Sequence, residues 1–148
     1  MEIKLAKQMA EELMAQHGIH SWVVVFDNAT TRRGQTRFRK QEISLSKPIT
    51  ELNPVEQIRN TILHEIAHVL VGEGHGHDDI WRSKAIEIGC TGQTCTPTVN
   101  KVPGKYSLKC THCGEVFNTY YRRPKIVNHW HQKCGRIAIN KLELIVNS

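Results

Sequence analysis

The sequence has no apolar run long enough to cross a membrane. Its longest apolar runs, such as residues 22–26, are far shorter than the roughly 20 residues that a membrane-spanning helix requires. The first 18 residues include acidic side chains where a secretory signal peptide would be apolar. Internal repeats and low-complexity tracts are also absent, so nothing indicates a repeat protein. We therefore expect a cytoplasmic protein with no membrane association.

The length leaves no room for two large domains. At 148 residues, the chain can hold one catalytic core and a small appendage, since domains usually contain about 100 to 150 residues. Hydrophobic residues make up 39% of the chain, which is typical of a folded globular protein and too apolar for a wholly disordered one. In a reducing cytosol, the five cysteines are expected to be metal ligands or free thiols rather than disulfides.

Acidic residues are scarce in the last third of the chain. Residues 1–100 carry 11 Lys and Arg against 12 Asp and Glu, whereas residues 101–148 carry 9 basic and 2 acidic residues. The net charge of +6 therefore arises from the last third alone. Such a basic segment favours a polyanionic partner, of which nucleic acid is the usual one.

Hydrophobic spacing and turn residues predict three helices and a small sheet. The predicted elements are a helix over residues 2–17, a strand over 21–26, one or two strands of a small antiparallel sheet over 36–46, a helix over 53–71 and a helix from Asp78 or Asp79 to Gly89. The first strand is rich in valine and aromatic residues, so we expect it to be buried on both faces. Residues 91–105, with two prolines and two glycines, are expected to form a linker.

The second predicted helix has clear start and stop signals. Asn53 is a good N-cap, Pro54 suits the first helical position, and Glu56 stands where a capping box needs an acid. Gly72 ends the helix, and the glycine-rich residues 72–77 predict a tight, adaptable loop.

This helix carries the motif His64-Glu65-Ile66-Ala67-His68. Two histidines four residues apart lie on one helical face, so both can bind the same ion. Zinc lowers the pKa of a bound water, and Glu65 is placed to take a proton from it and pass that proton to a leaving amine. The apolar residues around the motif favour a buried functional site over two incidental histidines.

A catalytic zinc usually has three protein ligands, so the chain must supply a third. His75 and His77 both follow within the glycine-rich loop. We prefer His77, because it lies just before the third helix, where Trp81 can pack against its ring. His75 is the alternative.

Two short motifs in the basic segment predict a structural zinc site. Cys110 and Cys113, and likewise His131 and Cys134, are pairs of ligands three residues apart and followed by glycine. Together they form a closed set of four ligands, typical of a zinc ribbon. In this reading Cys90 and Cys95 are free and pack as small apolar residues.

Other ligand sets are open for this site. Cys90, Cys95, Cys110 and Cys113 form a competing set with plausible ribbon spacing, and His129 is an alternative to His131. Replacing either group of ligands and counting the zinc ions left would distinguish these sets.

Between the two motifs, two aromatic side chains are followed by basic ones, a combination that suits nucleic acid, with aromatic faces for bases and charges for phosphates. These residues are Tyr120, Tyr121, Arg122, Arg123 and Lys125. A solvated hairpin loop would account for them equally well.

The metal motif, the Gly-His-Gly-His loop before Trp81 and the two cysteine motifs together resemble the SprT-like (Spartan-type) metalloprotease family, over nearly the whole chain. In that family the third histidine is commonly followed by glycine and, four positions on, by an aromatic residue. His77 has Trp81 at that distance but is followed by Asp78, whereas His75 has the glycine and lacks the aromatic residue. The resemblance therefore supports His77.

The resemblance implies a minimal gluzincin-like core and, for the better understood members, DNA repair through DNA-dependent proteolysis of proteins crosslinked to DNA. We predict an α+β fold: a metalloprotease core over residues 1–98, with helices on a short antiparallel sheet, followed by a zinc ribbon over residues 106–148. The predicted cofactors are one catalytic and one structural zinc ion.

The predicted function is a DNA-associated zinc endopeptidase that acts on DNA-bound or DNA-crosslinked proteins. We expect a cytoplasmic, nucleoid-associated monomer whose partners are protein substrates and DNA. A non-enzymatic zinc-containing DNA-binding or regulatory protein is the main alternative, and a hydrolase of non-peptide bonds is another.

Overall fold

The computed structural model describes residues 1–94, 100–111, 113–125 and 142–147. The chain divides into two units, Met1–Val102 and Pro103–Ser148. The first unit has the element order α1, β1, β2, β3, α2, α3, α4, and the second contains β4, β5 and β6. In the part of the chain that the structure describes, no helix is long and apolar enough to span a membrane.

The first unit is built on a three-stranded mixed sheet of order β1-β3-β2, formed by β1 (Val23–Asp27), β2 (Gly34–Arg37) and β3 (Glu42–Ser46). β3 runs antiparallel to β2, as expected for residues 36–46, but parallel to β1. The expectation of a wholly antiparallel sheet is therefore wrong. Alternating side chains specify which face of a strand is buried, and they carry no information about the direction of its neighbour.

β3 is the central strand and β1 is an edge strand. Residues 43–46 of β3 are all buried, whereas in β1 only Val24 is buried and Val23 is 56% exposed. The prediction that β1 is buried on both faces is therefore wrong. Its valines reflect β propensity and one covered face, because an edge strand borders solvent along one side.

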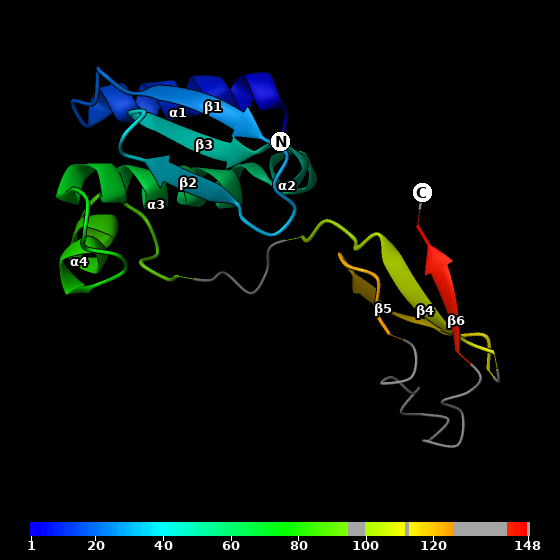
Figure 1. Ribbon diagram of the computed structural model, residues 1–148. Helices are drawn as coiled ribbons and strands as arrows, with labels where there is room; N and C mark the ends of the chain where they lie inside the picture. The colour runs from blue at the N-terminus through cyan, green and yellow to red at the C-terminus, as the bar shows by residue number, and fades with distance from the viewer. Residues whose placement is uncertain (95–99, 112, 126–141, 148) are drawn as a thin grey trace. The chain divides into compact units, whose positions relative to one another are not determined.

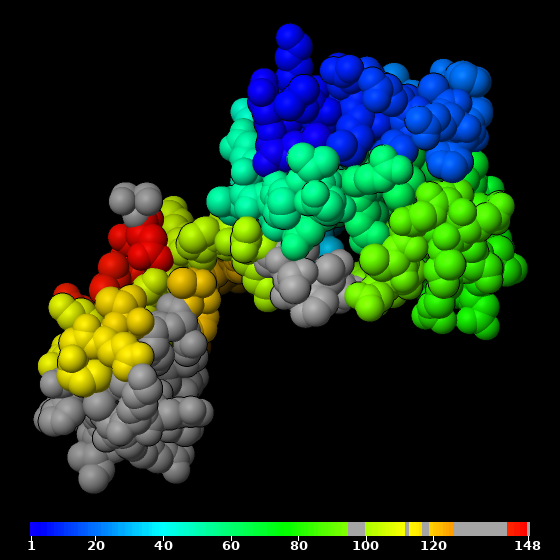
Figure 2. Space-filling view, turned by 180° about the vertical axis from the view of Figure 1, so that it is seen from behind, coloured from blue at the N-terminus to red at the C-terminus, as the bar shows by residue number. Residues whose placement is uncertain are grey.

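In the described residues of the first unit, four helices accompany the sheet: α1 (Ile3–Gln16), α2 (Lys47–Leu52), α3 (Val55–Val71) and α4 (Asp79–Glu87). α1 packs on β1 and on α3, and α3 packs on β2, β3 and α4. Figure 1 shows the sheet in front of α1 and α3, so these helices cover one of its faces. Figure 2 shows the opposite side of this unit, with α1 in blue and α4 in bright green.

The predicted helices α1, α3 and α4 are all present, but the start of α3 differs from the prediction. α3 begins at Val55 with Pro54 as its N-cap, and Asn53 is instead the C-cap of α2, a short helix that the sequence analysis missed. The buried Asn53 side chain donates to the carbonyls of Ile49 (2.8 Å) and Asn100 (2.9 Å) and accepts from Asn100 N (2.7 Å). Asn100 lies 47 residues away from Asn53 in the sequence, so a local capping pattern could not predict this partner.

The core of the first unit lies between the sheet and the helices. Its buried side chains come from α1, β1, β3, α3 and α4, and include Leu13, Ile43, Ile62, Ile66 and Trp81. Cys90 also belongs to this core, where its Sγ lies 3.7 Å from the carbonyl oxygen of Asn60. Cys90 thus packs as a small apolar residue, and Cys95 lies outside the described residues.

The second unit contains an antiparallel sheet of order β5-β4-β6, formed by β4 (Tyr106–Cys110), β5 (Val116–Tyr120) and β6 (Leu142–Val146). Leu108 and Cys110 are fully buried in its central strand. Gly104 lies so close to Tyr120 that an added Cβ would clash with the backbone nitrogen of that residue. Only glycine fits at this position.

Candidate metal centre

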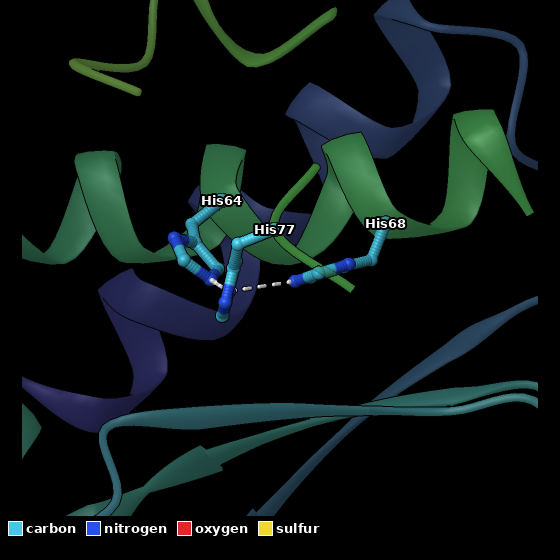
Figure 3. Close-up of side chains that lie close together, drawn as sticks. All are labelled: His64, His68 and His77. Atoms are coloured by element: carbon cyan, nitrogen blue, oxygen red, sulfur yellow. Dashed lines mark hydrogen bonds between the residues drawn. The ribbon is translucent and has the colours of Figure 1, made fainter. Parts of the chain in front are cut away.

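Three histidine side chains converge beside α3 (Figure 3). His64 and His68 project from neighbouring turns of α3, and His77 reaches them from the loop that follows the helix. The Nε2 atom of His77 lies 2.9 Å from that of His64 and 3.3 Å from that of His68. Their ligand atoms all lie within 4.8 Å of one another, so the three residues could hold one metal ion.

The loop between α3 and α4 brings His77 to this position. Gly72, Gly74 and Gly76 have φ values of +90°, +98° and +56°, in the left-handed region that favours glycine. α4 then begins at Asp79, and its N-cap Asp78 accepts a hydrogen bond from Trp81 N on Oδ1 at 2.9 Å. The predicted glycine-rich loop and the predicted start of α4 are confirmed, and together they place His77 immediately before the helix.

The indole ring of Trp81 packs against the rings of all three histidines. Its side chain is fully buried, and its ring centroid lies 4.6 Å from that of His64, 5.3 Å from that of His68 and 4.6 Å from that of His77. Its Nε1 also donates to the backbone oxygen of His64 at 3.4 Å. One indole therefore restrains all three imidazoles.

His75 lies apart from this group. Its Nδ1 is 3.0 Å from Asp78 Oδ2, so it pairs with the residue that caps α4. Both carboxylate oxygens of Asp78 are thus engaged in holding the loop and the helix start. Of the two candidate third ligands, the structure brings His77 to His64 and His68 and leaves His75 beside Asp78.

The electrostatics of the site keep two of the imidazoles neutral. Burial, together with the charges of His68, His77 and Arg33, lowers the pKa of His64 to about 3. Burial and the charge of His77 lower the pKa of His68 to about 4. Both side chains are therefore unprotonated at neutral pH, which is the form that binds a metal ion.

Glu65 lies beside the histidines and is almost completely buried, with 6% of its surface exposed. Thr36 on β2 donates its hydroxyl hydrogen to Glu65 Oε2 at 2.8 Å. Burial raises the pKa of Glu65 to about 7, against the opposing effects of Thr36 and of the Arg32 charge. A carboxyl group with a pKa near the working pH is suited to general base catalysis.

Two pockets meet at this site. One is lined by residues 31–34, Asn60, Thr61, Gln93 and Thr94, and the other by residues 34–36, Phe38, His68 and the loop glycines. Both pockets also share Gly34, His64, Glu65 and His77. The centre is therefore open on two sides.

Sequence reasoning missed two residues of this centre, Gly34 and Thr36. Both lie on β2 and contact Glu65, and 29 residues separate Thr36 from it. A threonine and a glycine in a strand carry no local signal of such a role. The role of these two residues becomes visible only when β2 packs against α3 in the tertiary structure.

The predicted structural site is described only in part. Gly114 has a φ of +77° and donates its N–H to Cys110 O at 2.7 Å, so the chain turns tightly around the first cysteine motif. Cys110 is buried and Cys113 is exposed. His129, His131 and Cys134 lie outside the described residues.

The predicted nucleic-acid-binding residues lie at the end of β5 and directly after it. Tyr120 ends that strand and is half-buried, whereas Tyr121, Arg122, Arg123 and Lys125 are exposed.

Comparisons with known proteins place this chain in a family. The model of the SprT-like family matches residues 3–101, which is more than half of the chain. The fold is similar to the crystal structure of the metallopeptidase zymogen of Methanocaldococcus jannaschii jannalysin, with a TM-score of 0.50 and 16% sequence identity, over 64% of this chain and 85% of that chain. None of the curated proteins compared with the chain matches it. The resemblance drawn from the metal motif is confirmed, and the chain belongs to the SprT-like family.

Proposed function

We propose that this protein is a zinc-dependent endopeptidase, with His64, His68 and His77 as the zinc ligands and Glu65 as the general base. The observation that carries the proposal is the convergence of three imidazoles beside one buried carboxylate. Membership of the SprT-like family and the likeness to a metallopeptidase fold support it.

The three imidazoles fit a zinc ion in chemistry and spacing. Two nitrogens that bind one tetrahedral zinc at about 2.0–2.1 Å lie about 3.3 Å apart. The Nε2 separations of 2.9 and 3.3 Å are close to that value. Three protein ligands also leave one position for water or substrate, as in other catalytic zinc sites.

When bound, zinc lowers the pKa of water towards neutrality and polarises a carbonyl group. Glu65 accepts the proton of the water that attacks the peptide carbonyl, because its carboxylate lines the same pockets as His64 and His77. The same carboxylic acid then donates this proton to the leaving amine, so the peptide bond breaks with no net change in Glu65. Trp81 holds the histidine rings in place, and the burial of Glu65 limits competing contact with solvent.

The two pockets support cleavage within a chain rather than at its end. They extend in two directions from Glu65 and His77, so a peptide has room on either side of the bond that is cut. An exopeptidase would need one of these directions to be closed.

Replacing Glu65 with glutamine tests the enzymatic proposal. The variant is expected to retain zinc and fold but to lose at least about 100-fold in the rate of casein cleavage, because general acid–base catalysis contributes about that much. Zinc content by atomic absorption and circular dichroism are measured alongside. Equal cleavage by both proteins would refute the role of Glu65. Zinc binding without cleavage by the wild type, with and without DNA, would favour the non-enzymatic alternative.

We further propose that a zinc ribbon over residues 106–148 binds DNA and brings the peptidase, over residues 1–98, to DNA-bound or DNA-crosslinked proteins. The net positive charge of residues 101–148 and the exposure of Arg122, Arg123 and Lys125 support this proposal. Cys110, Cys113, His131 and Cys134 would hold the proposed second zinc. The tight turn at Gly114 supports Cys110 and Cys113 as one pair of this set.

A paired charge replacement tests DNA binding. Changing Arg122 and Arg123 to glutamine should weaken binding at low salt and reduce the slope of log K against log salt by about 2, one phosphate contact for each arginine. Changing the exposed Lys4 and Lys7 of α1 removes the same charge and serves as the control. If both pairs weaken binding equally, the effect is one of net charge, and the proposed contacts are wrong.

Counting zinc tests the second site. The wild type should bind two zinc ions per chain, and Cys113→Ser should bind one fewer while casein cleavage persists. An unchanged zinc count in this variant would exclude Cys113 as a ligand.

A further inference from the structure

Two residues of β2 hold the Glu65 carboxylate from the side opposite to the helix. Side chains at alternate positions of a strand share a face, so positions 34 and 36 of β2 point the same way. That face meets α3, against which β2 packs. At position 36 it presents a hydroxyl group, and at position 34 it presents no side chain at all.

Thr36 fixes one carboxylate oxygen. Its Oγ1 lies 2.8 Å from Glu65 Oε2 and 3.2 Å from the backbone oxygen of the same residue. With one hydrogen to donate, the hydroxyl favours the nearer, more basic carboxylate oxygen. Residue 36 therefore supplies a hydroxyl donor to one oxygen of the acidic group.

Gly34 provides the space in which the carboxylate sits. A Cβ added to Gly34 would lie 2.9 Å from Glu65 Oε1, 3.0 Å from Cγ and 3.3 Å from Cδ. Side-chain atoms do not approach that closely, so one partner would have to move. The movable partner is the end of the Glu65 side chain, because Gly34 is fixed in the sheet by its pairing with β3.

From this geometry we infer that Thr36 and Gly34 are positioning residues for the general base. A glutamate side chain has three rotatable bonds, and a base works only from those orientations that reach the attacking water. The hydroxyl of Thr36 selects one orientation, and the bare backbone at Gly34 permits it. The inference rests on the proposed role of Glu65 and deepens it.

Substitutions at Thr36 test the hydroxyl. Thr36→Val has nearly the same shape and lacks the donor, so kcat for casein cleavage should fall about 10- to 100-fold, as is usual when an outer partner of a catalytic group is lost. KM and zinc content should stay near wild type. Thr36→Ser keeps the hydroxyl and should recover most of kcat. Thr50→Val, at a buried position of α2 outside both pockets, controls for a threonine-to-valine change in the core.

Gly34→Ala tests the space. It should lower kcat at least about 10-fold while zinc content and the thermal midpoint change little, because the added methyl displaces Glu65 rather than the sheet. Gly34→Ala combined with Glu65→Gln should be no slower than Glu65→Gln alone. That non-additivity would separate an effect on Glu65 from a general disturbance of the cleft.

These results separate this inference from the proposed function. A wild type that cleaves casein and a Thr36→Val variant that cleaves it equally well would overturn the positioning role and leave Glu65 as the base. A Thr36→Ser variant as slow as Thr36→Val would also overturn it. A wild type with no more activity than Glu65→Gln would instead overturn the proposed function.

Discussion

Replacing Trp81 with alanine should destabilise the first unit by about 3–5 kcal/mol, the usual cost of truncating a buried aromatic residue. Trp81 is fully buried and packs under three histidines. An indole that buries about 150–250 Å² contributes about 4–6 kcal/mol at 25 cal/mol/Å², which is an upper estimate because the unfolded chain is itself partly compact. The two estimates agree.

Urea unfolding followed by circular dichroism, with a chelator present, measures this loss without a contribution from metal. Trp81→Phe keeps an aromatic ring at this position but loses the hydrogen bond to His64, so it should lower the free energy of unfolding by about 1–2 kcal/mol. This variant should remain folded even if Trp81→Ala does not. Trp22→Ala is the matched control, because Trp22 is only half-buried and its ring packs against Phe38 rather than against a histidine.

Zinc affinity, measured by competition with a chromogenic chelator, distinguishes support of the histidines from packing alone. Trp81→Phe should bind zinc more weakly than Trp22→Ala. The role assigned to this side chain would be refuted if Trp81→Ala lowered the free energy of unfolding by less than about 1 kcal/mol. Unchanged zinc affinity in both Trp81 variants would also refute it.

Three further predictions concern the first unit. His77→Ala should lose the catalytic zinc whereas His75→Ala should retain it, which metal analysis of both variants would check; the opposite pattern would make His75 the ligand. Asn53→Ala should lower the free energy of unfolding by about 1–3 kcal/mol, because the buried carbonyl of Ile49 loses its donor and Asn100 loses two hydrogen bonds; an unchanged urea midpoint would contradict this. Burial alone would raise the pKa of Asp27, but hydrogen bonds from Ser44, Ala29 and Arg32 outweigh it and hold the pKa below its ordinary value. Ionised Asp27 therefore stabilises the fold above its unfolded pKa, and this contribution is lost as pH falls through the folded pKa, so the stability deficit of Asp27→Asn should shrink below about pH 4; a constant deficit from pH 7 to 3 would contradict it.

The metal helix could be predicted from sequence because its signals are local. The spacing of His64 and His68, the apolar residues between them and the stop at Gly72 all lie within one helix. The same holds for α4, where Asp78 caps the helix and Trp81 lies one turn further on. The predicted association of His77 with this centre followed from that spacing.

Features that depend on distant partners could not be predicted. Asn53 has the residue type of an N-cap, yet its hydrogen bonds go to Asn100 and to Ile49 of the preceding helix. The parallel pairing of β1 with β3 leaves no trace in the alternation of either strand. Likewise, Thr36 gains its partner only when β2 packs against α3.

The glycine-rich loop that carries His77 has a consequence for the lifetime of the protein. Because residues 72–77 include three glycines with positive φ, this loop can adopt many backbone conformations when nothing binds it. The conformational entropy lost when the loop is fixed is therefore large. Under the proposed zinc assignment, one ion ties this loop to α3, and the binding free energy of the metal becomes part of the stability of α4. Zinc supply would then regulate abundance as well as activity, since metal-free copies open more often and are removed by cellular proteases.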